Sequence, residues 1–210
     1  MNDWIFILII FVSAFLSIHG RYIEKRTIHY IFKPLTTILI IVYALRIALP
    51  NIMDYGYLIL AGLLFSLVGD IFLMLPQNKF IEGLVSFLIA HVLFLIGFVS
   101  IGGVNFSYYI FLPYIFVGSF LYYFLFPGLK NYKISVLLYL LIIFIMSWQA
   151  FECYRVVNSV KTLYALIGTF FFIFSDFIIA LNKFRYQFKS SQILILSTYY
   201  VSLVLIATSI

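Results

Sequence analysis

The chain has 210 residues, of which 65% are hydrophobic and 10% are charged, and its mean hydropathy is +1.17. Soluble domains of ordinary composition are far more polar, so this composition excludes a soluble fold and predicts one integral membrane domain over residues 1–210. The formal net charge of +6 comes from Lys and Arg in short loops, where such residues set membrane topology, and we expect no nucleic-acid partner.

Apolar segments alternate with polar clusters and with Pro or Gly along the whole chain. About 20 apolar residues span a bilayer core, so each segment predicts one crossing and the fold class is an all-α polytopic membrane protein. The first two segments are short for a crossing. The eight predicted transmembrane helices cover 3–18, 34–50, 56–75, 80–100, 104–126, 133–151, 161–181 and 191–210.

The basic residues fall mainly in alternate loops. The even-numbered loops hold Arg46, Arg155 and Lys161. Lys and Arg concentrate in cytoplasmic loops, so we expect the odd-numbered loops to be cytoplasmic and both termini to be non-cytoplasmic, in a multi-pass protein of the bacterial plasma (inner) membrane. The odd-numbered loops hold Arg21, Lys25, Arg26, Lys33, Lys79, Lys130, Lys133, Lys183, Arg185 and Lys189.

Two segments resemble each other at an offset of 106 residues. Each has Gly, seven further residues and then Asp: Gly62 to Asp70 in the third predicted helix, and Gly168 to Asp176 in the seventh. The offset spans four helices, so the two copies would run in the same direction across the membrane. The pattern favours a four-plus-four internal repeat.

The two aspartates are the most informative residues of the sequence. Asp70 and Asp176 each lie five residues before the predicted end of a helix, on the cytoplasmic side. A charged residue inside a span costs about 2.5–3.5 kcal/mol on insertion scales, so such residues usually face a cavity or a partner. Two at equal depth predict one shared site, and the competing interpretation is a structural polar clamp.

Four further polar residues are expected near the same half of the bundle: His91, Lys33, Tyr139 and Tyr199. Each also has a simpler interpretation. His91 would make an interhelical hydrogen bond, Lys33 would extend to the membrane surface, and the tyrosines would serve as interfacial or packing residues.

The sequence gives little support for a metal site or for a serine nucleophile. Cys153 is the only cysteine, and two of the three histidines, His19 and His29, lie in a basic loop away from His91. HExxH, GxSxG and Walker patterns are absent. We therefore expect no metal and no cofactor, and catalysis by carboxylates fits the inventory best.

Several short motifs, in order between residues 33 and 200, resemble the YhhN family of membrane proteins. They are Lys33-Pro34-Leu-Thr-Thr; Gly62 to Asp70 followed by Phe80-x-x-Gly83-x-x-x-Phe87-x-x-x-His91; Tyr139 with Met146-Ser-Trp-Gln-Ala150; Phe172-x-x-Ser175-Asp176; and Gln192 with Thr198-Tyr199-Tyr200. The characterised members of this family are lysoplasmalogenases. The resemblance implies a hydrolase acting on ether bonds, an alkenylglycerophosphocholine or alkenylglycerophosphoethanolamine hydrolase.

In that reaction the vinyl-ether bond of a lysoplasmalogen yields a fatty aldehyde and a glycerophospho-alcohol. The partners implied are a lysophospholipid substrate and membrane lipid. An acid protonates the β-carbon and a carboxylate stabilises the oxocarbenium ion and activates water, which are roles for Asp70 and Asp176 in either order. His91 would orient water or an aspartate. The substrate-binding candidates are Lys33, for the phosphate, Tyr139 and Tyr199, for substrate oxygens, and Ser175 and Gln192, from the motifs.

Buried acids, a mid-membrane histidine and repeats are also typical of secondary transporters. The alternative is therefore a proton-coupled transporter of a small or lipid-like solute. A non-catalytic lipid receptor or scaffold is a third interpretation. Consumption of the vinyl ether by purified protein distinguishes the enzyme from both.

Overall fold

The computed structural model describes residues 3–50, 52–75 and 79–210, and these residues form eight α-helices, each long and apolar enough to cross a membrane. This confirms the predicted all-α fold with eight spans. Two short 3₁₀ turns, η1 (Phe126–Gly128) and η2 (Lys130–Tyr132), connect the fifth and sixth helices. The helices are α1 (Asp3–Tyr22), α2 (Arg26–Ala48), α3 (Asp54–Met74), α4 (Phe80–Gly102), α5 (Tyr108–Leu125), α6 (Lys133–Val157), α7 (Val160–Phe184) and α8 (Ser191–Thr208).

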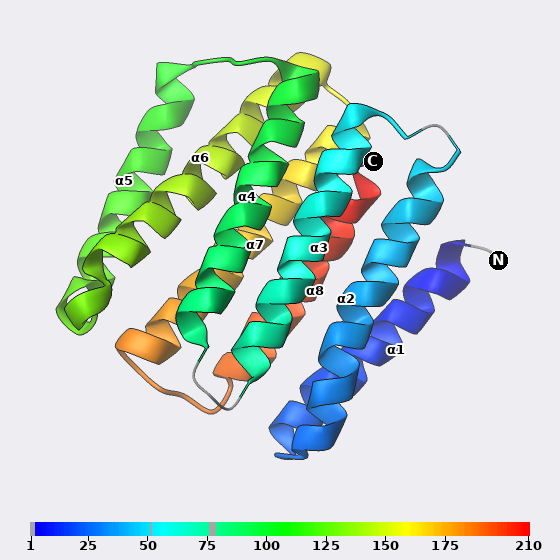
Figure 1. Cartoon of the computed structure of the whole chain (residues 1–210). Helices are drawn as coiled ribbons and strands as arrows, with labels where there is room; N and C mark the ends of the chain where they lie inside the picture. Colours follow the sequence, from blue (N-terminus) through cyan, green and yellow to red (C-terminus); the bar gives the residue numbers. More distant parts are fainter. Residues whose placement is uncertain (1–2, 51, 76–78) are drawn as a thin grey trace.

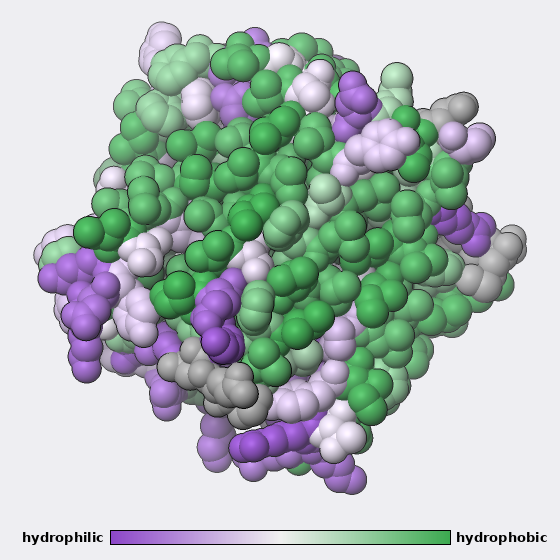
Figure 2. All heavy atoms as spheres, in the orientation of Figure 1, coloured by the Kyte–Doolittle hydropathy of each residue, from purple (hydrophilic) through white to green (hydrophobic). Residues whose placement is uncertain are grey.

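The helices form a bundle in which α1 and α5 lie at opposite edges (Figure 1). The connections α1–α2, α5–α6 and α7–α8 lie at one end of the bundle, together with the end of α3 and the start of α4, and the start of α1 and the end of α8 lie at the other (Figure 1). Figure 2 shows an apolar band over the face in view, with hydrophilic side chains gathered towards the end that carries these connections. Such a band is what a lipid-facing surface requires.

The first two helices are longer than the sequence predicted. α1 has 20 residues and α2 has 23, so the expectation of two short spans is wrong. α2 begins at Arg26 instead of residue 34, which places Lys33 and Pro34 inside it. Arg26, His29 and Lys33 follow each other at helical spacing and all line an internal cavity, so their polarity does not end the helix.

Glycines allow two helix pairs to pack closely. A Cβ atom at Gly62 would lie 2.3 Å from the ring of Phe94, so this glycine lets α3 approach α4. A Cβ atom at Gly168 would lie 2.8 Å from Ile206 and 3.1 Å from the Ser202 carbonyl oxygen, so α7 approaches α8 in the same manner. The two glycines thus have corresponding roles, and the four-plus-four repeat stays a prediction.

We expect Gly62→Ala to destabilise the protein by about 1–3 kcal/mol, because the added methyl group overpacks the α3–α4 contact against a rigid ring. Gly97→Ala is the matched control at the same helix pair, since its Cβ atom would have its nearest neighbours at 3.5 Å, an ordinary contact. The measurement is the thermal unfolding midpoint in detergent. Equal midpoints for the two variants would contradict the packing argument.

Candidate functional site

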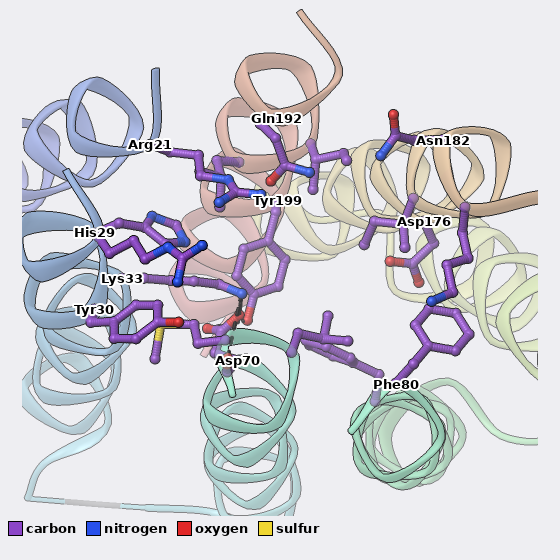
Figure 3. A pocket seen from close by; sticks show the side chains of 18 of the residues that line it. Arg21, His29, Tyr30, Lys33, Asp70, Phe80, Asp176, Asn182, Gln192 and Tyr199 are labelled. Carbon is purple, nitrogen blue, oxygen red and sulfur yellow. Dashed lines mark hydrogen bonds and ion pairs between the residues drawn. The ribbon is translucent and has the colours of Figure 1, made fainter. Parts of the chain in front are cut away.

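A polar cavity of about 540 Å³ lies within the bundle at the end that carries the α1–α2 and α7–α8 connections. Asp70 of α3 and Asp176 of α7 both line it, and Figure 3 shows them on different sides of the space in front of Tyr199. The two aspartates of the sequence pattern therefore face one cavity. Its lining is Arg21, Arg26, His29, Tyr30, Lys33, Asp70, Leu73, Met74, Phe80, Phe87, Asp176, Ile179, Asn182, Lys183, Gln187, Gln192, Ile195, Leu196 and Tyr199.

Asp70 is buried and fully engaged by neighbouring donors. The Lys33 ammonium lies 3.2 Å from its Oδ1 atom. The hydroxyl groups of Thr37 and Tyr199 donate to its Oδ2 atom over 2.7 and 2.8 Å. Lys33 and Thr37 are four residues apart and so lie on one face of α2, which directs both at the same carboxylate. An ion pair with two further hydrogen bonds is the arrangement that holds an ionised carboxylate away from water.

Asp176 has a different environment. The Tyr139 hydroxyl of α6 donates a hydrogen bond to its Oδ2 atom, and the Nε2 atom of His91 lies 3.9 Å from the same oxygen. No lysine or arginine of the described residues forms an ion pair with it. Asp176 is also the more open of the two aspartates, because 11% of its side chain is exposed against 1% for Asp70. One carboxyl group is thus charge-paired and the other is not.

The two aspartates have different partners at positions that correspond in the sequence. Lys33 and Tyr139, the α2 and α6 partners of the two aspartates, are separated by 106 residues, as Asp70 and Asp176 are. The α3 aspartate therefore has a cation where the α7 aspartate has a phenol. Their distances from the helix ends differ as well: Asp70 lies four residues before the end of α3, whereas Asp176 lies eight before the end of α7, which continues past the predicted residue 181.

His91 lies beside Asp176 without lining the cavity. Its side chain is fully buried, with ring centroids 4.6 Å from Phe172 and 5.3 Å from Tyr139. Neither ring nitrogen has a hydrogen-bond partner among the described residues. A buried polar group without a partner is costly, so this imidazole is an exception among the buried polar side chains of the bundle.

The residues predicted to bind substrate differ in where they lie. Gln192 lines the cavity near its mouth, whereas the Ser175 hydroxyl donates to the Ile195 carbonyl oxygen over 3.1 Å and is not among the lining residues. Tyr139 and Tyr199, expected to contact substrate oxygens, each donate to an aspartate. The lysine expected at the phosphate is instead paired with Asp70.

A narrow apolar pocket of about 40 Å³ adjoins the polar cavity between α4, α6 and α7. Its lining is Leu73, Phe80, Leu84, Phe87, Val136, Tyr139, Leu140, Ile143, Ile173, Asp176, Phe177, Ile179, Ala180 and Phe184. Asp176 lines both spaces and is the only ionisable carboxyl group of the apolar pocket. This aspartate therefore lies at the border between a polar and an apolar compartment.

Some residues near the site were not predicted from the sequence. Thr37 belongs to the Lys33 motif and lies four residues after Lys33, a spacing that places both side chains on one face of the helix and could have identified it. Arg21, Arg26 and His29 were attributed to a loop but line the cavity. At the opposite end of the bundle, Glu152 lies just beyond the predicted sixth helix, yet it is 1% exposed and accepts hydrogen bonds from Ser107, Trp148 and Arg155.

The functional groups of the site are carboxylates, phenols, a hydroxyl group and an ammonium group. Among the described residues, no three His, Cys, Asp or Glu side chains gather closely enough to hold a metal ion. Such a set is suited to proton transfer and to stabilising a developing positive charge.

The known proteins similar to this chain include proteins named YhhN and proteins named lysoplasmalogenase. The chain is 27% identical to the uncharacterized membrane protein YhhN of Shigella flexneri over 207 residues, which cover 99% of this chain and 98% of that protein. It is 35% identical over 156 residues to lysoplasmalogenase TMEM86A of Bos taurus and 35% over 158 residues to the same protein of Homo sapiens, covering 72% of this chain and 64% of each relative. No solved structure matches. The YhhN family profile matches residues 28–210, and the chain therefore belongs to the YhhN family.

Proposed function

We propose that this protein is a membrane hydrolase that cleaves the vinyl-ether bond of lysoplasmalogens. The observation that carries the proposal is the place of Asp176, which lines both the polar cavity and the apolar pocket. In a lysoplasmalogen the vinyl ether joins the polar glycerophospho headgroup to the hydrocarbon chain, so a lipid with its head in the polar cavity and the first carbons of its chain at the apolar pocket presents this bond to Asp176. The two relatives named lysoplasmalogenase support the same substrate class.

The first chemical step is protonation of the β-carbon of the vinyl ether, and we assign the proton donor to Asp176. A donor must be protonated before it reacts, and Asp176 forms no ion pair with a lysine or arginine among the described residues. Its Oδ2 atom accepts from Tyr139, which leaves Oδ1 to carry the proton. Proton transfer breaks the C=C π bond and forms an oxocarbenium ion at the α-carbon.

Asp70 supplies the complementary charge. Its pairing with Lys33 and two hydroxyl groups fits an ionised carboxylate that faces the cavity and stabilises the cation. Water then adds to the α-carbon, and the proton it loses returns to the Asp176 carboxylate. The resulting hemiacetal collapses to a fatty aldehyde and the glycerophospho-alcohol, so one water is consumed and no cofactor is required.

His91 and Tyr139 act through Asp176. The Tyr139 hydroxyl donates to its carboxyl group, the Nε2 atom of His91 lies 3.9 Å from the same oxygen, and neither residue lines the polar cavity. We therefore assign both as residues that position the acid. Tyr139 also lines the apolar pocket, so its ring would contact the first carbons of the chain.

The test of this function is fatty-aldehyde release by detergent-purified protein given a lysoplasmalogen. The matched control substrate is the saturated-ether analogue of the same chain length, which has no double bond to protonate and should remain intact. Release of aldehyde from the first alone supports the proposal. Protein that stays folded and leaves the vinyl ether intact would overturn it and favour transport.

We also propose that the site opens to the cytoplasm, in the plasma membrane, because the basic residues counted in the odd-numbered loops, apart from the buried Lys33, lie in or beside the connections at its end of the bundle. The native Cys153 is buried, so Lys25→Cys provides a single accessible thiol. This thiol should react with a membrane-impermeant maleimide in permeabilised cells only. Labelling of intact cells would reverse the orientation.

A further inference from the structure

A second cavity, of about 740 Å³, adjoins the mouth of the catalytic cavity. It is lined by Gly20, Arg21, Tyr22, Ile23, Glu24, Arg26, His29, Tyr30, Lys189, Gln192 and Ile193. Five of these residues, Arg21, Arg26, His29, Tyr30 and Gln192, line the first cavity as well. The α1–α2 connection and the start of α8 thus form a vestibule, by which we mean this second cavity, leading to the aspartates.

The vestibule carries an excess of positive charge. Arg21, Arg26 and Lys189 face a single carboxylate, that of Glu24, which leaves two positive charges uncompensated. Neither arginine side chain forms an ion pair or a hydrogen bond with another described residue. Figure 3 shows the Arg21 side chain extending towards Tyr199 and Gln192. Cations without partners at the mouth of a cavity are suited to an anionic ligand.

Two helices also begin at this mouth. α2 starts at Arg26 and α8 at Ser191, and neither N-cap side chain accepts a hydrogen bond from the helix. The N–H groups of Arg26 and Ser191 already donate to backbone carbonyl oxygens, so these helix starts contribute the positive end of the helix dipole and not a set of free donors. The helix ends therefore add to the field of the arginines.

The inner lysine does not compete for the same ligand. Lys33 lies 3.2 Å from Asp70 and is buried, so its charge is already balanced inside the site. Arg21 and Arg26 lie on the path from the surface to the aspartates because they line both cavities. Guanidinium groups bind phosphate oxygens in pairs, which an ammonium group does not.

We propose that Arg21 and Arg26 form a phosphodiester-binding subsite that recognises the headgroup of a single-chain phospholipid. This inference rests on the proposed function for its view of the substrate, and it adds the residues that select a phosphate-bearing lipid over a neutral one. With the phosphate between the arginines, the glycerol backbone points inward along the cavity and carries the sn-1 oxygen towards Asp176.

The kinetic test compares two substrates that share the vinyl ether. One is the lysoplasmalogen, and the other is 1-O-alkenylglycerol, which lacks the phosphate. Arg21→Gln and Arg26→Gln should each raise KM for the lysoplasmalogen about tenfold, the loss of one charge-assisted contact, with kcat changed by less than about twofold. For the alkenylglycerol both constants should stay at wild-type values.

Lys25→Gln is the matched control, because Lys25 has the same charge and lies between the two arginines in sequence but lines neither cavity. It should leave KM for both substrates unchanged. An equal rise in KM for both substrates in the arginine variants would indicate a structural effect and overturn the subsite. So would no rise, or the same rise in Lys25→Gln.

A binding measurement separates this proposal from the catalytic one. The probe is the saturated-ether analogue 1-O-alkyl-glycerophosphocholine, whose binding is measured as thermal stabilisation in dodecylmaltoside. It should stabilise the wild type and Lys25→Gln, and stabilise the double variant Arg21→Gln/Arg26→Gln far less; 1-O-alkylglycerol should not distinguish them. This result decides the subsite even if the protein cleaves no vinyl ether. Equal stabilisation by chain-free glycerophosphocholine would assign a soluble phosphodiester instead and overturn the lipid proposal.

Discussion

Asp176→Asn is expected to lower fatty-aldehyde release about 10²- to 10⁴-fold, the range contributed by a general acid. The substitution keeps the size of the side chain and leaves an amide oxygen to accept from Tyr139, so the fold should persist. It removes the proton that the β-carbon needs. Asp70→Asn should also reduce activity, but for another reason, since it leaves the Lys33 charge without its partner.

The assay is steady-state aldehyde release by purified variants, with the thermal unfolding midpoint measured on the same samples. Asp54→Asn is the matched control, because Asp54 is exposed at the start of α3 and lines neither cavity. It should retain wild-type activity. Full turnover by a folded Asp176→Asn protein would remove this residue from the mechanism.

The second large effect is on stability. Lys33→Met should lower the free energy of unfolding by about 3–5 kcal/mol, because it leaves the Asp70 carboxylate buried without its cation. Methionine fills most of the volume of the lysine side chain, so the loss of packing is small. Asp176→Asn breaks no ion pair with lysine or arginine and should cost much less.

A double-mutant cycle checks the cause. In Lys33→Met/Asp70→Leu both charges are gone, and stability should return close to the wild-type value, as buried ion pairs replaced by apolar residues often do. The measurement is unfolding by SDS in mixed micelles. Strictly additive losses in the double variant would show that the two side chains are not coupled.

Much of the fold was predictable because each crossing needs a long apolar segment, and polar residues between such segments mark the loops. The same rule misplaced the start of α2. Arg26, His29 and Lys33 interrupt the apolar pattern, yet they face an internal cavity where polar residues are stable. The predicted sixth helix stopped at residue 151, before Glu152, for a similar reason, since the partners of this carboxylate, Ser107, Trp148 and Arg155, are not visible in hydropathy.

The residues of the candidate site could be predicted better than the contacts between them. The cost of charge inside lipid identified Asp70 and Asp176, and the structure brings both to one cavity. From the sequence, either aspartate could take either catalytic role. Their difference depends on which face of α2 and α6 turns towards them, which is set by helix packing across the whole bundle and not by local pattern.

The matching positions of Lys33 and Tyr139 bear on why both halves of the site belong to one polypeptide. A symmetric homodimer of four-helix subunits would present two aspartates with identical neighbours, because every substitution would occur twice. Such an assembly could not give one carboxylate a lysine and the other a tyrosine. A single chain can change each position separately, so one aspartate has a lysine and the other a tyrosine. The division of labour that we propose for the two acids requires this asymmetry, which a single chain makes possible.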